Sequence, residues 1–319
     1  MIPCAALAVV GLCQVPVAAD PVATSLVTFT TLGTNSGPIP NASRAEPANL
    51  IRLGDQTIVV DVGDGAAGQL ARAGVNLGQV RTIFISHLHF DHTGGLFGLL
   101  GERYQAGYGG ELTIYGPPGT KQLIDGLLLG MQPGIVVSAT IRGPAPPSEG
   151  KDIKVIEIGD GANVAIGTLT VTAAANTHYS TLPPPEQGSV RPLSLSFRFD
   201  APGRSIVYTG DTGPSENVER LCQGADLLVS EIMDPVAALA AIKASRPDLP
   251  DFVLKIVESH FRSEHLAPIE VGLLAQRCGA KALVLTHDAI ADDAIPAARD
   301  KIAASYKGPI TFAKDVDSF

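Results

Sequence analysis

The feature that most constrains the fold is a run of metal-binding side chains at the end of an apolar segment. Residues 80–86 read Val-Arg-Thr-Ile-Phe-Ile-Ser, which predicts a strand, and His87, His89, Asp91 and His92 follow at once. Residues two apart on an extended chain point to the same side, so His87 and His89 can bind one ion together. Asp91 and His92 come where the backbone turns, and we expect them to face a second ion.

A pair of ions needs more ligands than these four. Two-metal hydrolases hold their ions roughly 3.5–4 Å apart. Three further candidates, each at the end of an apolar strand, are His178, Asp211 and His287. None of the three would be unusual alone, but ligands on the strand ends of one rigid scaffold form a consistent set. Imidazole and carboxylate donors without thiolate favour two zinc ions, and also suit manganese or iron.

The order of the predicted elements indicates the fold class. Two β-rich halves, each followed by helices, predict an α/β protein built as an αββα sandwich, with two stacked mixed β-sheets flanked by helices. We find no linker, so residues 20–319 are expected to form a single catalytic domain. The proline- and glycine-rich stretch Pro133–Lys151 is expected to be a loop or flap, and Tyr179–Gly188 a second loop near the active site.

The N-terminus has features of an export signal. Residues 5–12 are apolar and too short to span a bilayer, and Val17-Ala18-Ala19 suits cleavage after small residues, although no Lys or Arg precedes them. Residues 1–19 are therefore expected to be a signal peptide, and the protein periplasmic or secreted. No later segment is long and apolar enough for a membrane helix. Cleavage would leave Cys222 and Cys278, whose pairing the sequence leaves open.

The order of the motifs resembles the metallo-β-lactamase superfamily: His-x-His-x-Asp-His, then a histidine, then Gly-Asp-Thr, then Thr-His. Within that superfamily the chain is similar to the ribonuclease Z and arylsulfatase-like branch. Further matches to this branch are Leu32-Gly33-Thr34 with Pro38, Pro40 and Arg44, the stretch Val60–Gly65, and the stretch Ser263–Gly272. The resemblance covers nearly all of the chain after Ser25.

The resemblance implies a role for each matching residue. The first metal would take His87, His89 and His178, the second would take Asp91, His92 and His287, and Asp211 would bridge them. Asp61 would support the site. The implied catalytic residues are Asp91 as proton acceptor, His265 as the group that assists the reacting atoms, and Glu231, which orients His265. His260 is expected to be a solvated loop histidine.

The expected activity is hydrolysis by a metal-bound hydroxide. The net charge is −9, and the 23 Lys and Arg residues form no run. Because residues 133–151 also lack a basic arm, we expect a small-molecule ester-type substrate (arylsulfatase-like, phosphodiester or lactone), no nucleic acid and no membrane span. The alternatives are β-lactam hydrolysis, a ribonuclease Z-like phosphodiesterase, and a non-catalytic metal-binding protein of the same fold. A homodimer is compatible with the sequence.

Overall fold

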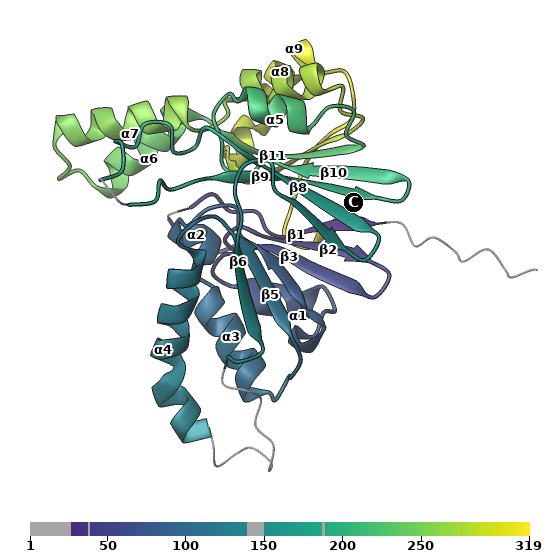
Figure 1. Cartoon of the computed structure of the whole chain (residues 1–319). Helices are drawn as coiled ribbons and strands as arrows, with labels where there is room; N and C mark the ends of the chain where they lie inside the picture. The colour runs from purple at the N-terminus through teal and green to yellow at the C-terminus, as the bar shows by residue number, and fades with distance from the viewer. Residues whose placement is uncertain (1–26, 38, 139–149, 187–188) are drawn as a thin grey trace, which may run out of the picture.

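Two β-sheets stacked face to face form the centre of the structure, with helices on both outer faces (Figure 1). The computed structural model describes residues 27–37, 39–138, 150–186 and 189–319. Each sheet has seven strands, and the expected αββα sandwich is confirmed. The signal peptide expected at residues 1–19 lies outside the described residues.

The first sheet has the strand order β14-β1-β2-β3-β4-β5-β6. The bounds are β14 Asp317–Ser318, β1 Thr28–Gly33, β2 Ala48–Leu53, β3 Gln56–Val62, β4 Thr82–Phe84, β5 Leu112–Gly116 and β6 Ile153–Glu157. The pairs from β14 to β3 are antiparallel, and the pairs from β3 to β6 are parallel. The carboxyl ends of β3 and β4 therefore lie side by side, and they carry Asp61 and the segment that starts at His87.

The second sheet repeats this plan in the order β13-β12-β11-β10-β9-β8-β7. The bounds are β13 Ile310–Phe312, β12 Leu283–Ala289, β11 Leu227–Met233, β10 Arg204–Tyr208, β9 Leu195–Ala201, β8 Leu169–Ala175 and β7 Asn163–Ile166. The pairs from β7 to β10 are antiparallel, and those from β10 to β13 are parallel.

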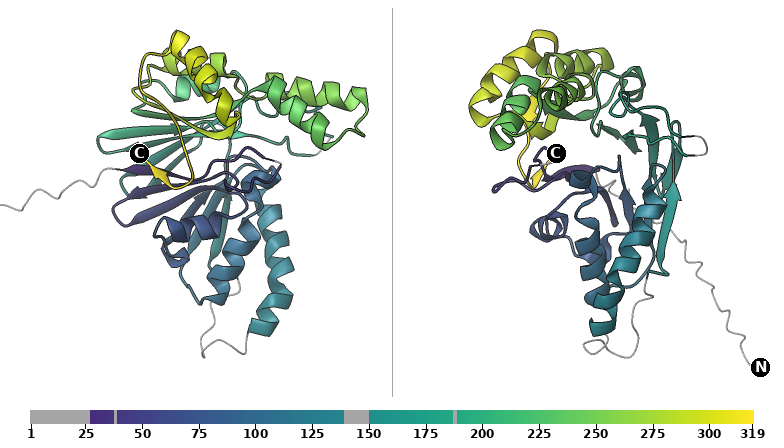
Figure 2. Two further views of the ribbon diagram at one scale, coloured as in Figure 1. Left: turned by 180° about the vertical axis from the view of Figure 1, so that it is seen from behind. Right: turned by 90° about the vertical axis from the view of Figure 1, so that its left-hand side faces the viewer.

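Three apolar layers hold the sandwich together. The layer between the sheets contains Phe84, whose ring meets those of Phe197 and Phe199 edge-on at centroid distances of 5.4 Å and 6.0 Å. The outer layers lie under two sets of helices, which Figure 2 shows on opposite sides. The first sheet is covered by α1 (Ala66–Arg72), α3 (Leu96–Gln105) and α4 (Thr120–Ser138), and the second by α5 (Glu216–Leu221), α8 (Pro268–Cys278) and α9 (Ile295–Ser305).

The remaining helices lie near one end of the sandwich. The short α2 (Phe90–Thr93) follows the histidine run, and α6 (Pro235–Ser245) and α7 (Asp251–Ser263) form a hairpin that projects to one side (Figure 1). Two single-turn 3₁₀ helices, η1 (Leu77–Gln79) and η2 (Asp292–Ala294), complete the elements of the described residues. No helix in the described part of the chain combines the length and apolar character needed to cross a bilayer.

The prediction of a loop at Pro133–Lys151 is wrong for Pro133–Ser138. Helix α4 continues through Pro133 to Ser138, and residues 139–149 lie outside the described residues. Proline disrupts a helix interior because it lacks an N–H and its ring clashes with the preceding turn. Here Met131 and Ile135, one turn apart, are buried in the layer against the first sheet, and this packing outweighs the cost of the proline.

The pairing that the sequence left open is present in the structure. Cys222, at the end of α5, forms a disulfide with Cys278, the last residue of α8, and their Cα atoms are 5.3 Å apart. Both residues are buried in the layer over the second sheet. The disulfide therefore links two helices of that layer.

Candidate metal centre

All seven metal-ligand candidates meet at one end of the sandwich, where strands of both sheets finish. His87 and His89 follow β4, and Asp91 and His92 lie on α2. Strands β8, β10 and β12 of the second sheet deliver the other three, His178, Asp211 and His287. Their donor atoms form two groups, one of three histidines and one of two histidines and two aspartates.

The first group consists of three ring nitrogens. Nδ1 of His89 is 3.1 Å from Nε2 of His87 and 3.1 Å from Nε2 of His178. Nδ1 of His178 donates to the carbonyl oxygen of Glu264 at 3.0 Å. Nε2 of His178 therefore keeps a free lone pair that can bind a cation. Burial lowers the pKa of both His87 and His178 well below the usual range, so both are neutral imidazoles suited to bind a cation.

The second group surrounds Asp211. Oδ1 of Asp211 is 3.3 Å from Nε2 of His92, and Oδ2 is 3.3 Å from Nε2 of His287. Oδ2 of Asp91 is 3.3 Å from the same nitrogen of His287. Oδ2 of Asp211 also lies 3.8 Å from Nε2 of His87, in the first group. Asp211 thus stands between the two groups, where a bridging carboxylate would stand.

The donor set fits divalent cations on two observations. Nε2 of His92 and Oδ1 of Asp211 are buried without a hydrogen-bond partner, although buried polar atoms normally have one. Burial alone would lower the pKa of His92, but the carboxylates of Asp211, Asp91 and Asp61 outweigh it and raise that pKa well above its usual range. Surroundings that favour a proton on this ring would also favour a metal cation beside it.

Asp61 holds the histidines in orientation from behind. Its carboxylate accepts hydrogen bonds from Ser86 N at 2.7 Å, Ser86 Oγ at 2.8 Å, Tyr208 Oη at 2.9 Å and His92 Nδ1 at 2.9 Å. Because the Ser86 hydroxyl gives its proton to Asp61, it accepts from His87 Nδ1, 3.0 Å away. Both rings are thereby fixed with Nε2 toward the centre. Asp61 itself has a φ of 60°, a strained angle that these bonds maintain.

His265 and Glu231 form a buried pair beside the two groups. Oε2 of Glu231 accepts from Nδ1 of His265 at 2.7 Å, and Oε1 accepts from Thr212 N at 2.6 Å. The His265 ring lies 4.8 Å from that of His178 and 6.2 Å from that of His287. Glu231 therefore fixes the orientation of the His265 ring, and the catalytic role expected of the pair stays a prediction.

The expectation that His260 is a solvated loop histidine is wrong. It lies on α7, its ring is 5.4 Å from that of His178, and its Nδ1 contacts the carboxylate of Glu264. Glu264, which the sequence analysis missed, is buried and also accepts from Thr181 N at 2.6 Å. A histidine and a glutamate four residues apart near the end of a helix are a signal that could have revealed this pair.

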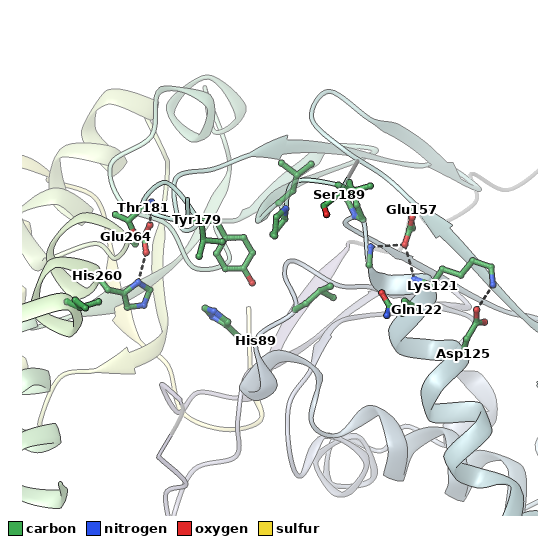
Figure 3. A pocket seen from close by; sticks show the side chains of 18 of the residues that line it. His89, Lys121, Gln122, Asp125, Glu157, Tyr179, Thr181, Ser189, His260 and Glu264 are labelled. Atoms are coloured by element: carbon green, nitrogen blue, oxygen red, sulfur yellow. Dashed lines mark hydrogen bonds and ion pairs between the residues drawn. The ribbon is translucent and has the colours of Figure 1, made fainter. Parts of the chain in front are cut away.

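A large cavity of about 1280 Å³ opens beside the first group. Figure 3 shows His89 and Tyr179 between two walls: His260 and Glu264 on one side, and Lys121 on α4 on the other. The ring of Tyr179 lies 5.2 Å from that of His89. Tyr179 therefore belongs to the site, as expected for the loop that it begins.

The comparisons with known proteins agree with this geometry. The family model described as a beta-lactamase superfamily domain matches residues 56–287, so the chain belongs to the metallo-β-lactamase superfamily. It is 29% identical to ribonuclease Z of Mycolicibacterium gilvum (strain PYR-GCK), over 82% of this chain and 84% of that protein. It is also 29% identical to ribonuclease Z of Mycobacterium avium (strain 104), over 82% of this chain and 86% of that protein.

Solved structures share the fold. The metallo-beta-lactamase fold protein YhfI from Bacillus subtilis superposes with a TM-score of 0.66 at 20% identity, covering 92% of this chain and 98% of that one. The short form of human tRNase Z gives a TM-score of 0.62 at 23% identity, with the same coverage of 92% and 98%. The resemblance to the ribonuclease Z branch is confirmed.

These relatives correct two expectations. A small-molecule, arylsulfatase-like substrate and the exclusion of nucleic acid are both wrong, because the relatives matched over most of their length are ribonucleases and support a nucleic-acid phosphodiesterase. The net charge of −9 was a poor guide to the substrate, because it sums the charges of the whole chain and not those of the site. A scissile phosphate is bound locally, and divalent cations can be the largest charges at such a site.

Asp61 generates the first prediction. Asp61→Asn should lower metal affinity about 10- to 100-fold, because loss of a carboxylate behind a ligating histidine typically has this effect. Titration of the metal-free protein with zinc, followed by competition with a chelator, measures it. Tyr208→Phe removes one donor to Asp61 but keeps the carboxylate, and should cost much less. Equal affinities of Asp61→Asn and the unaltered protein would contradict the role of Asp61.

Proposed function

We propose that the chain is a dinuclear zinc phosphodiesterase of the ribonuclease Z type that cleaves RNA. The observation that carries the proposal is the convergence of seven nitrogen and oxygen donors in two groups, with Asp211 between them. The ribonuclease Z relatives support the substrate class. Donors without thiolate favour zinc over softer metals, and metal analysis of the purified protein would separate it from manganese or iron.

In this proposal His87, His89 and His178 would hold the first cation, Asp91, His92 and His287 would hold the second, and Asp211 would be shared between them. Divalent cations held there would lower the pKa of water and offset the negative charge that builds up on a phosphodiester as it reacts. Asp61 keeps the ligating nitrogens of His87 and His92 aimed at the centre.

The other residues of the site handle protons. Asp91 would accept a proton from the attacking water. His265 would give a proton from Nε2 to the leaving oxygen while its Nδ1 donates to the carboxylate of Glu231, 2.7 Å away. Burial lowers the pKa of His265, so its protonated form depends on the nearby carboxylates of Asp211, Asp91 and Glu264, which act in the opposite direction. The second residue pair, His260 and Glu264, closes the wall of the large cavity opposite Lys121 (Figure 3).

The charges of the large cavity agree with a strand bound mainly at its scissile phosphate. Among the described residues that line it, Lys121 is the only Lys or Arg, and it pairs with Asp125 at 2.6 Å. The other two carboxylates of the cavity lining accept hydrogen bonds from the backbone. Glu157 accepts from the N–H groups of Gly119 and Lys121, and Glu264 accepts from that of Thr181. The lining therefore sets one positive side chain against three carboxylates, so it offers no positive charge to further phosphates, and binding of the strand would depend on the cations of the centre.

Asp211→Ala tests the proposal directly. The zinc-loaded protein should cleave a 3′-extended tRNA precursor or a single-stranded RNA. Asp211→Ala should abolish cleavage and lower bound zinc from about two equivalents to one or fewer, because the shared ligand is lost. Metal analysis and gel-resolved cleavage measure both. Asp55→Ala, in the exposed turn between β2 and β3, is the matched control. A fully metallated, active Asp211→Ala would refute the bridging role, and no RNA cleavage by the zinc-loaded unaltered protein would refute the function.

His265→Ala tests the proton donor. We expect kcat on RNA to fall about 100-fold or more, as is typical when a general acid is removed, with zinc content unchanged. A phosphodiester with a nitrophenolate leaving group needs no protonation, so its hydrolysis should fall far less. Glu231→Gln keeps a hydrogen bond to His265, so its kcat on RNA should lie between that of the unaltered protein and that of His265→Ala. An equal loss on both substrates would contradict the assignment.

We also propose that the protein works in an oxidising compartment. The Cys222–Cys278 disulfide supports this, because such bonds persist where thiols are not kept reduced. If cells are treated with a membrane-permeant alkylating agent before lysis, both cysteines should resist it until a reductant is added. Mass spectrometry of the peptides reads the result. Alkylation of both cysteines without reduction would contradict the proposal.

A further inference from the structure

A large aromatic residue lies between two of the metal-ligand candidates in sequence, and its side chain is exposed to solvent. Phe90 separates His89 from Asp91 on α2, and its side chain is 88% exposed, more than any other large hydrophobic residue in the described part of the chain. Exposed apolar surface contributes nothing to folding, and it marks binding sites when it adjoins other apolar groups. The surroundings of Phe90 therefore show what it can bind.

Phe90 lines a second, smaller cavity of about 300 Å³. One wall of this cavity is apolar and comes mostly from the β11 end and the α6–α7 hairpin, with Met233, Ile242, Val257 and Phe261. The lining also includes four residues of the metal centre and its surroundings: Asp91, Asp211, His265 and His287. An occupant would thus touch both apolar side chains and the reacting centre.

The lining defines the chemistry of the occupant. No Lys or Arg is among the described residues that line the cavity, so it offers no side chain to neutralise a second phosphate. Its volume is at the lower end of ligand pockets, which hold roughly 300–1,000 Å³. Phe90 and Phe261 supply aromatic surface, on which bases of single-stranded nucleic acid stack regardless of sequence. A nucleobase is an uncharged flat ring, joined through one sugar to the scissile phosphate. It therefore matches the small volume, the aromatic surface and the lack of cationic side chains.

The linings of the two cavities indicate which part of the strand, relative to the cleaved bond, each cavity would hold. Both are lined by His89 and His260, so they meet over the centre. His265 and Asp91 both line the small cavity, and neither lines the large one. Asp91 would be held at the centre as a ligand of the second cation, whereas His265 is not among the seven proposed ligands and is proposed to protonate the leaving oxygen. The small cavity is therefore assigned to the leaving side of the bond.

We propose that the Phe90–Phe261 cavity binds one unstacked nucleobase, that of the nucleotide on the leaving side of the scissile phosphodiester. The inference rests on the proposed function and adds a subsite to it. The substrate is then an unpaired stretch of RNA at the point of cleavage, because a base held in a duplex cannot enter a cavity lined by α2 and α7.

The test compares two single-stranded RNAs that differ only on the leaving side of the cleaved bond, where one has a base and the other an abasic ribose. With the zinc-loaded unaltered protein, loss of the base should lower kcat/KM about tenfold or more, the usual effect of one base–aromatic stack. Phe90→Ala should cause the same loss on the complete RNA and little further loss on the abasic RNA. Phe252→Ala is the matched control, since Phe252 is 66% exposed on α7 but does not line the cavity.

Other outcomes overturn the inference. If the unaltered protein cleaves both RNAs equally, or if Phe90→Ala lowers both rates equally, no base binds there. Should Phe90→Ala lose zinc or fold poorly, Phe90→Leu keeps the apolar volume without the ring and should still show a loss confined to the complete RNA.

A binding measurement separates this inference from the proposed function. A strand with 2-aminopurine at the leaving-side position and an uncleavable bond should show quenched fluorescence on the zinc-loaded unaltered protein, and less quenching on Phe90→Ala. Quenching without any RNA cleavage would retain the subsite and reject the nuclease. Cleavage without Phe90-dependent quenching would retain the nuclease and reject the subsite.

Discussion

The buried carboxylate of Asp211 is the interaction on which the site depends. It is 2% exposed and lies among the rings of His87, His92, His178 and His287, with its Oδ1 lacking any hydrogen-bond partner. A charge buried in this way is costly unless opposite charge accompanies it. Burial favours neutral imidazoles at His87 and His178, which cannot supply that charge. In the metal-free protein it comes from His92 and His287, because burial alone would lower the pKa of both rings but the carboxylate of Asp211 raises it. Divalent cations between the rings and the carboxylate would take the place of those protons, so the same arrangement would hold its metals firmly.

The sandwich is what brings these donors together. His87 and Asp61 come from the parallel half of the first sheet, and Asp211 and His287 from the parallel half of the second. The Phe84, Phe197 and Phe199 layer between the sheets fixes their separation. Tyr208 of the second sheet also donates to Asp61 of the first, a buried hydrogen bond that ties the sheets together directly behind the metal ligands.

Local patterns predicted much of this, and the failures have physical reasons. His87, His89, Asp91 and His92 are adjacent in sequence, so their spacing on a strand end defined a site without tertiary information. The two β-rich halves, each followed by helices, likewise predicted the stacked sheets. The extension of α4 through Pro133 could not be foreseen, because it depends on burial of Met131 and Ile135 against a sheet formed by distant residues. His260 was misjudged for the same reason: only the fold places it beside His178.

The substrate was misjudged on a different ground, since net charge is a property of the whole surface and recognition is a property of the site. The two cavities meet at His89 and His260, and their linings contain one Lys and no Arg among the described residues. Binding that relied on many phosphate contacts would need several such cations and would weaken steeply with salt. In the proposed function, cations at the centre and the aromatic rings beside it would achieve recognition over a short stretch instead. An acidic protein can therefore act on RNA, provided that it reads only the few nucleotides around the bond that it breaks.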